Sequence, residues 1–201
     1  MKQMMQLAFS ALALIAASAN ADDIRMGTPT YGGSGCPAGT AALNLTEDGK
    51  SLSVIFDQFT VNAGAATNQQ VDRKACSLAI PVHLPQGYSI SVYQVDFRGY
   101  SYIPSGGLGR FRAESTFDGN LGAISSKSFV GPVDKNFLVS QEIEAESEIW
   151  SRCGEDVQMR INTSIMARTN SRMDDTLIGV DSTDVRSELI YHFKWRRCSG
   201  H

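Results

Sequence analysis

The feature of this sequence that most constrains its fold is the alternation of apolar and polar residues along several short segments. Residues 189–197, LIYHFKWRR, place every second residue in one apolar series: Leu189, Tyr191, Phe193 and Trp195. Residues 111–117 and 156–168 alternate in the same way. Successive side chains of a β-strand point to opposite faces, so the alternation predicts strands with one buried and one exposed face.

These segments are separated by clusters of glycine, proline, asparagine and serine. Apart from an ambiguous stretch around Glu142, no segment carries the apolar stripe of an amphipathic helix. Many short alternating strands joined by turns are typical of two antiparallel sheets packed face to face. We therefore expect an all-β fold, an antiparallel β-sandwich of the jelly-roll-like kind.

Residues 76–97 predict two consecutive strands with a turn at residues 85–87, because proline presets one backbone dihedral and glycine tolerates positive φ. We interpret this segment as a β-hairpin. Its second strand is apolar on both faces between Val92 and Val95, which predicts a bulge or a strand covered on both sides.

Residues 1–21 have the features of a secretory signal peptide. A lysine precedes an apolar run from Leu7 to Ala17, and residues 19–21, ANA, fit the A-x-A cleavage pattern. We expect cleavage to leave residues 22–201 as a single secreted β-sandwich domain, extracellular or periplasmic. The apolar run is shorter than the roughly 20 residues that span a bilayer, and no later segment approaches that length, so we expect no transmembrane segment.

The charge balance bears on the partner class. The chain has 18 basic and 21 acidic side chains, a net charge of −3, and no run of basic residues. Nucleic-acid-binding proteins concentrate positive charge to meet the phosphates. We therefore expect no nucleic-acid partner.

The cysteines all follow the predicted leader: Cys36, Cys76, Cys153 and Cys198. An even number in an exported chain, with no C-x-x-C pair, predicts two disulfides rather than a zinc site. Three pairings are possible. We expect the one with the shortest loops, which joins Cys36 to Cys76 and Cys153 to Cys198.

The glycine-rich segment YGGSGCPAGT, residues 31–40, surrounds Cys36. A phosphate-binding loop would need a lysine and a following helix, whereas this segment has no lysine and continues into a predicted strand. We expect a tight turn pinned by the disulfide.

Five motifs follow one another along nearly the whole chain after the leader: GSGCPAGT (33–40), CSLAIPVHLPQGY (76–88), FRGY (97–100), WSRCG (150–154) and WRRC (195–198). With these motifs and all four cysteines, the chain resembles the family of small secreted proteins called domain of unknown function 4360. The resemblance implies an exported protein of the kind found in bacteria and fungi, with no established activity to carry over.

The segment QEIEAESEIW, residues 141–150, has a glutamate at every second position: Glu142, Glu144, Glu146 and Glu148. If the segment is extended, these side chains project from one face and repel one another. A basic row on a neighbouring strand would compensate them, and the sequence offers His192, Lys194 and Arg196.

A catalytic interpretation of the same glutamates competes with this one. EIEAE resembles the E-I-D-x-E strand of jelly-roll glycoside hydrolases, whose outer glutamates act as nucleophile and acid/base. A straight strand, however, holds Glu142 and Glu146 about 13 Å apart, while a retaining pair needs about 5 Å. A bulge would be required to shorten that distance.

A third candidate is FRGYSYIPSGG, residues 97–107, in which Arg98, Tyr100 and Tyr102 alternate. If these side chains face solvent, they form a stacking and hydrogen-bonding platform for a sugar or a partner protein. Tyrosines of a sandwich are more often half buried in its core, and both interpretations stay open.

An acidic segment and the histidines complete the candidates. The acidic segment offers four carboxylates that suit calcium but lack EF-hand spacing, so we expect a solvated loop and no metal: Asp174, Asp175, Asp181 and Asp184. No G-x-S-x-G motif anchors a serine hydrolase, and we interpret the three histidines as surface residues: His83, His192 and His201.

The sequence therefore predicts a secreted, non-enzymatic protein that binds a glycan or a surface protein, with no cofactor and no catalytic residue. The predicted binding residues are Arg98, Tyr100, Tyr102, Glu142, Glu144 and Glu146. One alternative is a jelly-roll glycoside hydrolase that uses the row from Glu142 to Glu146. Another is a secreted inhibitor or a structural envelope protein. The oligomeric state stays open.

Overall fold

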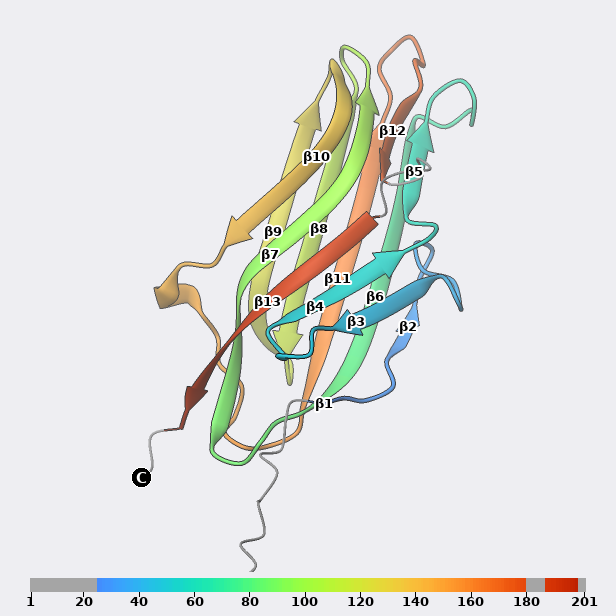
Figure 1. The fold of residues 1–201 in the computed structure, drawn as a ribbon. Coiled ribbons are helices and arrows are strands. Elements are labelled where there is room, and N and C mark those ends of the chain that lie inside the picture. Colours follow the sequence, from blue (N-terminus) through green and yellow to red (C-terminus); the bar gives the residue numbers. More distant parts are fainter. Residues whose placement is uncertain (1–24, 180–186, 199–201) are drawn as a thin grey trace, which may run out of the picture.

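The computed structural model describes residues 25–179 and 187–198, and the predicted signal peptide lies outside this part. The described residues form strands almost throughout and contain no α-helix. The strands make two antiparallel sheets that lie face to face (Figure 1). The predicted all-β sandwich is confirmed.

The six-stranded sheet lies at the back in Figure 1 and has the order β1-β6-β11-β8-β9, with β2 also paired to β6. Its strands are β1 (Arg25–Met26), β2 (Thr30–Gly32), β6 (Val71–His83), β8 (Leu108–Phe117), β9 (Asn120–Val130) and β11 (Val157–Arg168).

The seven-stranded sheet lies at the front and has the order β3-β4-β13-β7-β12-β5, with β10 on the other side of β7. Its strands are β3 (Ala41–Leu45), β4 (Ser51–Phe56), β5 (Thr60–Ala63), β7 (Tyr88–Ile103), β10 (Val133–Glu142), β12 (Thr176–Gly179) and β13 (Ser187–Arg197). Between β10 and β11, residues Ala145–Ser147 form a short 3-10 helix, η1.

The inner faces of the two sheets meet in a hydrophobic core. Phe97 of β7 stacks on Phe111 of β8 across it, with ring centroids 3.7 Å apart. Burial alternates with exposure along β11 from Val157 to Arg168, as its sequence predicts. Fully burying one large apolar side chain stabilises a fold by about 1.5–3 kcal/mol, so this alternation also fixes the register of each strand.

The predicted hairpin of residues 76–97 is wrong, because β6 and β7 belong to different sheets. The turn is present, with the Tyr88 N–H donating to the Pro85 carbonyl at 3.2 Å. It carries the chain from one sheet to the other, so the apolar faces of β6 and β7 meet across the core instead of side by side. Two strands joined by a turn have the same sequence pattern in either arrangement.

The predicted bulge in the second of these strands is confirmed. The register between β13 and β7 shifts between His192, which lies opposite Gln94, and Phe193, which lies opposite Val92. Tyr93 is the extra residue. The shift lets a strand that is apolar on both faces turn its side chains toward different neighbours along its length.

Both disulfides form with the predicted pairing. Cys36 and Cys76 hold the glycine-rich turn on β6, where the Gly35 N–H donates to the Ala75 carbonyl at 2.9 Å. Cys153 and Cys198 join the segment before β11 to the end of β13. The glycine-rich segment is thus a disulfide-pinned turn, as expected.

Candidate functional site

The candidate site is the outer face of the seven-stranded sheet, where β7 presents five consecutive outward-facing side chains. We call them the β7 row: Gln94, Asp96, Arg98, Tyr100 and Tyr102. Phe97, Gly99 and Ser101, which alternate with the last four of these residues, are buried. The side chain of Arg98 is 53% exposed, and Tyr102 is 44% exposed. The structure therefore brings the three predicted platform residues together on one solvent-facing line.

The strands on both sides of β7 set the surroundings of this row. Tyr102 lies opposite Asp134 of β10 on one side and Leu177 of β12 on the other. Tyr100 lies opposite Asn136 and Gly179. Because glycine has no side chain, β12 places no side chain beside Tyr100 at this position.

Glycine is required at that position for backbone reasons as well. Gly179 has φ of +134°, and a Cβ built there would lie 2.6 Å from the Thr60 Cα. Any larger residue would strain the pairing of β12 with β5. The pairing of β12 with β5 therefore fixes a residue without a side chain beside Tyr100.

A hydrogen bond orients Tyr100, and an ion pair orients Arg98. The Tyr100 hydroxyl donates to Asp134 Oδ1 at 2.6 Å, and this hydrogen bond, together with partial burial, raises the pKa of Tyr100 above its ordinary value. Arg98 Nη1 lies 3.7 Å from Glu188 Oε2 of β13. Both polar groups therefore have a defined orientation on the outer face of the sheet.

The lower end of the row holds a polar chain across three strands. His192 Nε2 of β13 lies 2.9 Å from Asp96 Oδ2, and His192 Nδ1 lies 3.1 Å from the Ser51 hydroxyl of β4. Gln94 and Ser140 donate to the other oxygen of Asp96. Burial opposes the charge of Asp96, but these donors outweigh it and hold the pKa of Asp96 below its ordinary value.

Ser51, His192 and Asp96 have the composition of a hydrolytic triad, yet acyl transfer also needs free N–H donors for the oxyanion. The N–H of Ser51 donates to Thr46 Oγ1 and that of Lys50 to Asp48 Oδ1. These donors are already occupied, so we interpret the chain as a fixed polar patch. Sequence analysis missed it because the three residues meet only through strand order.

The predicted glutamate row is not a strand. β10 ends at Glu142, and η1 then turns the chain, so Glu142, Glu144 and Glu146 are exposed without sharing one face. The expectation of an extended row is wrong because the Ile143 N–H makes the last bond to β7, at the Tyr93 carbonyl, before the chain turns away.

The predicted basic partners of that row mostly have other contacts. Lys194 Nζ meets Glu148 Oε1 at 2.6 Å, as expected. His192 binds Asp96 instead, and the Arg196 guanidinium lies 4.2 Å from the ring centroid of Trp150. Of the three predicted basic partners, Lys194 meets a glutamate of this segment, while His192 and Arg196 contact other residues.

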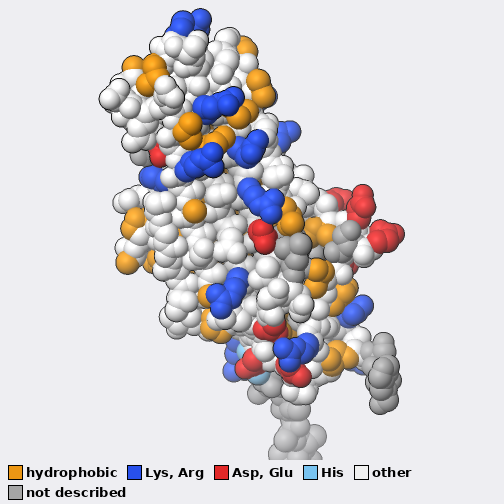
Figure 2. Space-filling model, turned by 180° about the vertical axis from the view of Figure 1, so that it is seen from behind, with side chains coloured by type: hydrophobic (Ala, Val, Ile, Leu, Met, Phe, Trp, Pro, Cys, Tyr) orange, Lys and Arg blue, Asp and Glu red, His pale blue; other side chains and the backbone are white. Residues whose placement is uncertain are grey.

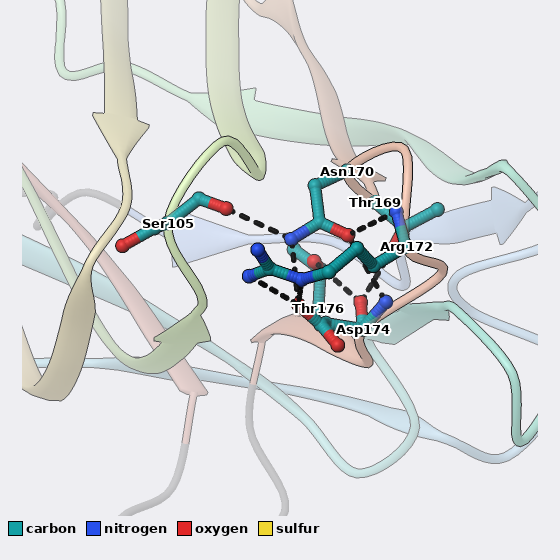
Figure 3. A network of polar contacts seen from close by, with 6 residues as sticks. All are labelled: Ser105, Thr169, Asn170, Arg172, Asp174 and Thr176. Atoms are coloured by element: carbon teal, nitrogen blue, oxygen red, sulfur yellow. Dashed lines mark hydrogen bonds and ion pairs between the residues drawn. The ribbon is translucent and has the colours of Figure 1, made fainter.

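A network of polar contacts orders the loops beyond Tyr102 (Figure 3). The Asn170 amide donates to the Ser105 carbonyl at 2.8 Å and to Asp174 Oδ2 at 2.7 Å. Arg172 donates to the same carboxylate at 2.9 and 3.0 Å, and the hydrogen bonds from Asn170 and Arg172 lower the pKa of Asp174. The network ties the loop after β11 to the turn after β7.

The calcium alternative finds little support in this loop. Asp174 is engaged by Asn170 and Arg172, and Asp175 Oδ1 accepts the Ala66 N–H at 3.0 Å. Asp181 and Asp184 lie outside the described residues. Within 25–179 and 187–198, no group of three or more histidine, cysteine or acidic side chains could hold a metal ion.

In the described part of the chain, no helix has the length and apolar character to cross a membrane.

A sequence model of the family described as "Domain of unknown function (DUF4360)" matches residues 22–198. An "Uncharacterized secreted protein" of Arthroderma benhamiae is 32% identical over 180 residues, which cover 89% of this chain and 74% of that protein.

Two solved structures show a distant likeness. TmCBM61 in complex with beta-1,4-galactotriose is 14% identical, with a TM-score of 0.27 over 84% of this chain and 88% of that one. The GH31 alpha-xylosidase of Xanthomonas citri is 11% identical, with a TM-score of 0.19 over 84% of this chain and 19% of that one. Likenesses this loose indicate neither a ligand nor an activity.

Proposed function

The chain belongs to the DUF4360 family and is a secreted protein, and from this premise we propose that it is a glycan-binding module whose ligand lies along the β7 row. The observation that carries the proposal is the line of exposed Arg98, half-buried Tyr100 and exposed Tyr102 on the outer face of a central strand. Aromatic rings with polar tips and arginines are enriched where proteins bind their partners.

The chemistry of the row matches that of a sugar chain. A tyrosine ring offers an apolar face for the C–H side of a pyranose and a hydroxyl at its edge. Arg98 adds a fork of N–H donors, while Asp134 and Asn136 flank the tyrosines with oxygen acceptors for sugar hydroxyls. Stacking faces beside fixed donors and acceptors suit a ligand that is polar at its rim and apolar on its faces.

The shape of the row favours a chain over a compact small molecule. Arg98 and Tyr102 are four residues apart on one strand, so their Cα atoms are about 13 Å apart. The surface between them is the outer face of one strand, along which consecutive units of a chain can lie. We therefore propose that several consecutive sugar units bind along β7.

A glycan array with the mature oxidised protein tests the proposal. The wild type should retain at least one glycan, and a variant with Arg98→Ala, Tyr100→Ala and Tyr102→Ala should lose it while its circular dichroism stays that of a β-protein. Equal retention by this variant would contradict the β7 row. Capture of a partner protein with no glycan retained would contradict the ligand class.

A second variant distinguishes the hydrolase alternative from glycan binding. Glu142→Gln with Glu146→Gln should bind the same glycan as the wild type, because Glu142 lies opposite Gln94, at the end of the row away from Tyr100 and Tyr102, and Glu146 lies in η1. Release of reducing ends from that glycan by the wild type, abolished in this variant, would replace the proposal with catalysis.

A further inference from the structure

The outer face of the six-stranded sheet, on the side opposite the β7 row, gathers positive charge. Figure 2 looks at this face and shows lysine and arginine side chains spread over it. The outward-facing arginines come from three adjacent strands: Arg73 of β6, Arg110 and Arg112 of β8, and Arg160 and Arg168 of β11. The whole chain has a net charge of −3, and these arginines are scattered along its sequence. Folding therefore brings them together on one face of a protein that is negatively charged as a whole.

A shallow hollow of about 450 Å³ lies within this face. Strand register explains its form: Met166 of β11 lies between Arg73 and Arg110, and Ser164 lies between Ala75 and Arg112. Small and flexible side chains therefore make the floor, and three guanidinium groups stand around it.

The disulfide-pinned turn closes one end of the hollow. Ser34 lines it, and the Ser34 hydroxyl oxygen accepts the Ala75 N–H at 3.1 Å. A Cβ at Gly33, whose φ is +142°, would lie 2.2 Å from the Ala75 carbonyl oxygen. Only glycine lets the turn lie this close to β6, so the rim of the hollow depends on the motif around Cys36.

Two of the three arginines are unused by the fold. Arg112 pairs with Glu114 at 2.9 Å. The side chains of Arg73 and Arg110 have neither an ion pair nor a hydrogen bond among residues 25–179 and 187–198. Lys74, which also lines the hollow, donates to the Gln58 carbonyl. A guanidinium group carries five N–H donors in a planar fork that fits carboxylate and sulfate oxygens.

We propose that this hollow is a second binding site, which takes the carboxylate or sulfate groups of an anionic polysaccharide. Arg73 and Arg110 lie two strand spacings apart, about 10 Å, and Arg110 and Arg112 about 7 Å apart along β8. This spacing suits charges that repeat along a chain. The lining contains no aromatic ring on which nucleic-acid bases would stack or which would anchor a lipid surface.

Direct titration with two polymers, heparin and polygalacturonate, tests this site and separates sulfate from carboxylate recognition. The wild type should bind at least one of them at low salt and more weakly at high salt, because exposed charges are screened. Arg73→Gln with Arg110→Gln should weaken that binding by about tenfold or more per arginine removed.

A matched variant controls for net charge. Lys50→Gln with Arg152→Gln removes the same charge from exposed positions outside the hollow, and it should bind like the wild type. Equal weakening in both double variants would overturn the proposal, as would no binding of either polymer by the wild type. Stronger binding to phosphatidylglycerol vesicles than to both polymers would also overturn it.

The two proposed sites can be tested independently of each other. The Arg98, Tyr100 and Tyr102 alanine variant should keep its affinity for the anionic polymer, and the Arg73 and Arg110 variant should keep the array glycan. Loss of polymer binding in the first variant would move the anion site to the opposite sheet and overturn the assignment of the hollow.

Discussion

The Tyr100 hydroxyl on β7 donates a 2.6 Å hydrogen bond to the Asp134 carboxylate on β10. This bond favours the protonated phenol, so the pKa of Tyr100 lies above its ordinary value of 10.0. The resulting stabilisation is fully present below pH 10 and is lost as pH rises through the raised pKa.

Asp134→Asn should lower the pKa of Tyr100 toward 10, because an amide oxygen is a weaker acceptor than a carboxylate. Tyrosinate absorbance measures the change as the difference between the wild-type and variant titrations, and Tyr100→Phe identifies the contribution of this residue. Identical titrations of the wild type and Asp134→Asn would contradict the bond.

Hydrogen bonds from Ser140, Gln94 and His192 favour the charged form of the Asp96 carboxylate. The pH dependence of its stabilising effect is therefore opposite to that of Tyr100. Because the folded state lowers its pKa, the stabilisation is present above the ordinary value of 3.8 and is lost as pH falls through the lowered pKa. Asp96→Asn should lower the free energy of unfolding at neutral pH by about 1–3 kcal/mol.

The difference between the two proteins should then shrink toward zero in acid. Urea unfolding at a series of pH values measures it. A difference that stays constant from neutral pH down to the acid limb would show that the charge of Asp96 does not carry the effect.

The disulfide from Cys36 to Cys76 spans 40 residues of sequence. Cross-linking a loop of that length removes conformational entropy from the unfolded chain and stabilises a fold by about 4 kcal/mol in the chain-entropy model. Cys36→Ser with Cys76→Ser should therefore lower the unfolding midpoint in denaturant. An unchanged midpoint, with the bond verified by non-reducing peptide mapping, would contradict this role.

Much of the scaffold follows from local pattern. Alternation predicted the strands of residues 111–117, 156–168 and 189–197, and double apolar character predicted the bulge beside Val92. Each of these features depends only on which face of a single strand is buried, and the hydrophobic pattern of that strand determines this.

Features that depend on which strands become neighbours were not predicted. The turn at residues 85–87 was correct, but its two strands lie in different sheets. The chain from Ser51 through His192 to Asp96 joins residues far apart in the sequence. Strand order comes from packing of the whole core, which no local window contains.

The candidate site falls between these cases. Alternation put Arg98, Tyr100 and Tyr102 on one face, but only the position of β7 within its sheet shows that this face is the outer one. For Glu142, Glu144 and Glu146 the same pattern misled, because η1 interrupts the strand there. Alternation at every second residue predicts which face a side chain occupies only where the backbone is paired in a sheet.

The most direct test of the account is the dissociation constant of the strongest array glycan for the wild type, Tyr102→Ala and Asn44→Ala. Asn44 of β3 faces the same side of the same sheet, three strand spacings or about 14 Å from β7. The account predicts a rise of about tenfold or more for Tyr102→Ala, as for a central stacking residue, and no change for Asn44→Ala. Unchanged affinity in Tyr102→Ala, or an equal loss in Asn44→Ala, would contradict it.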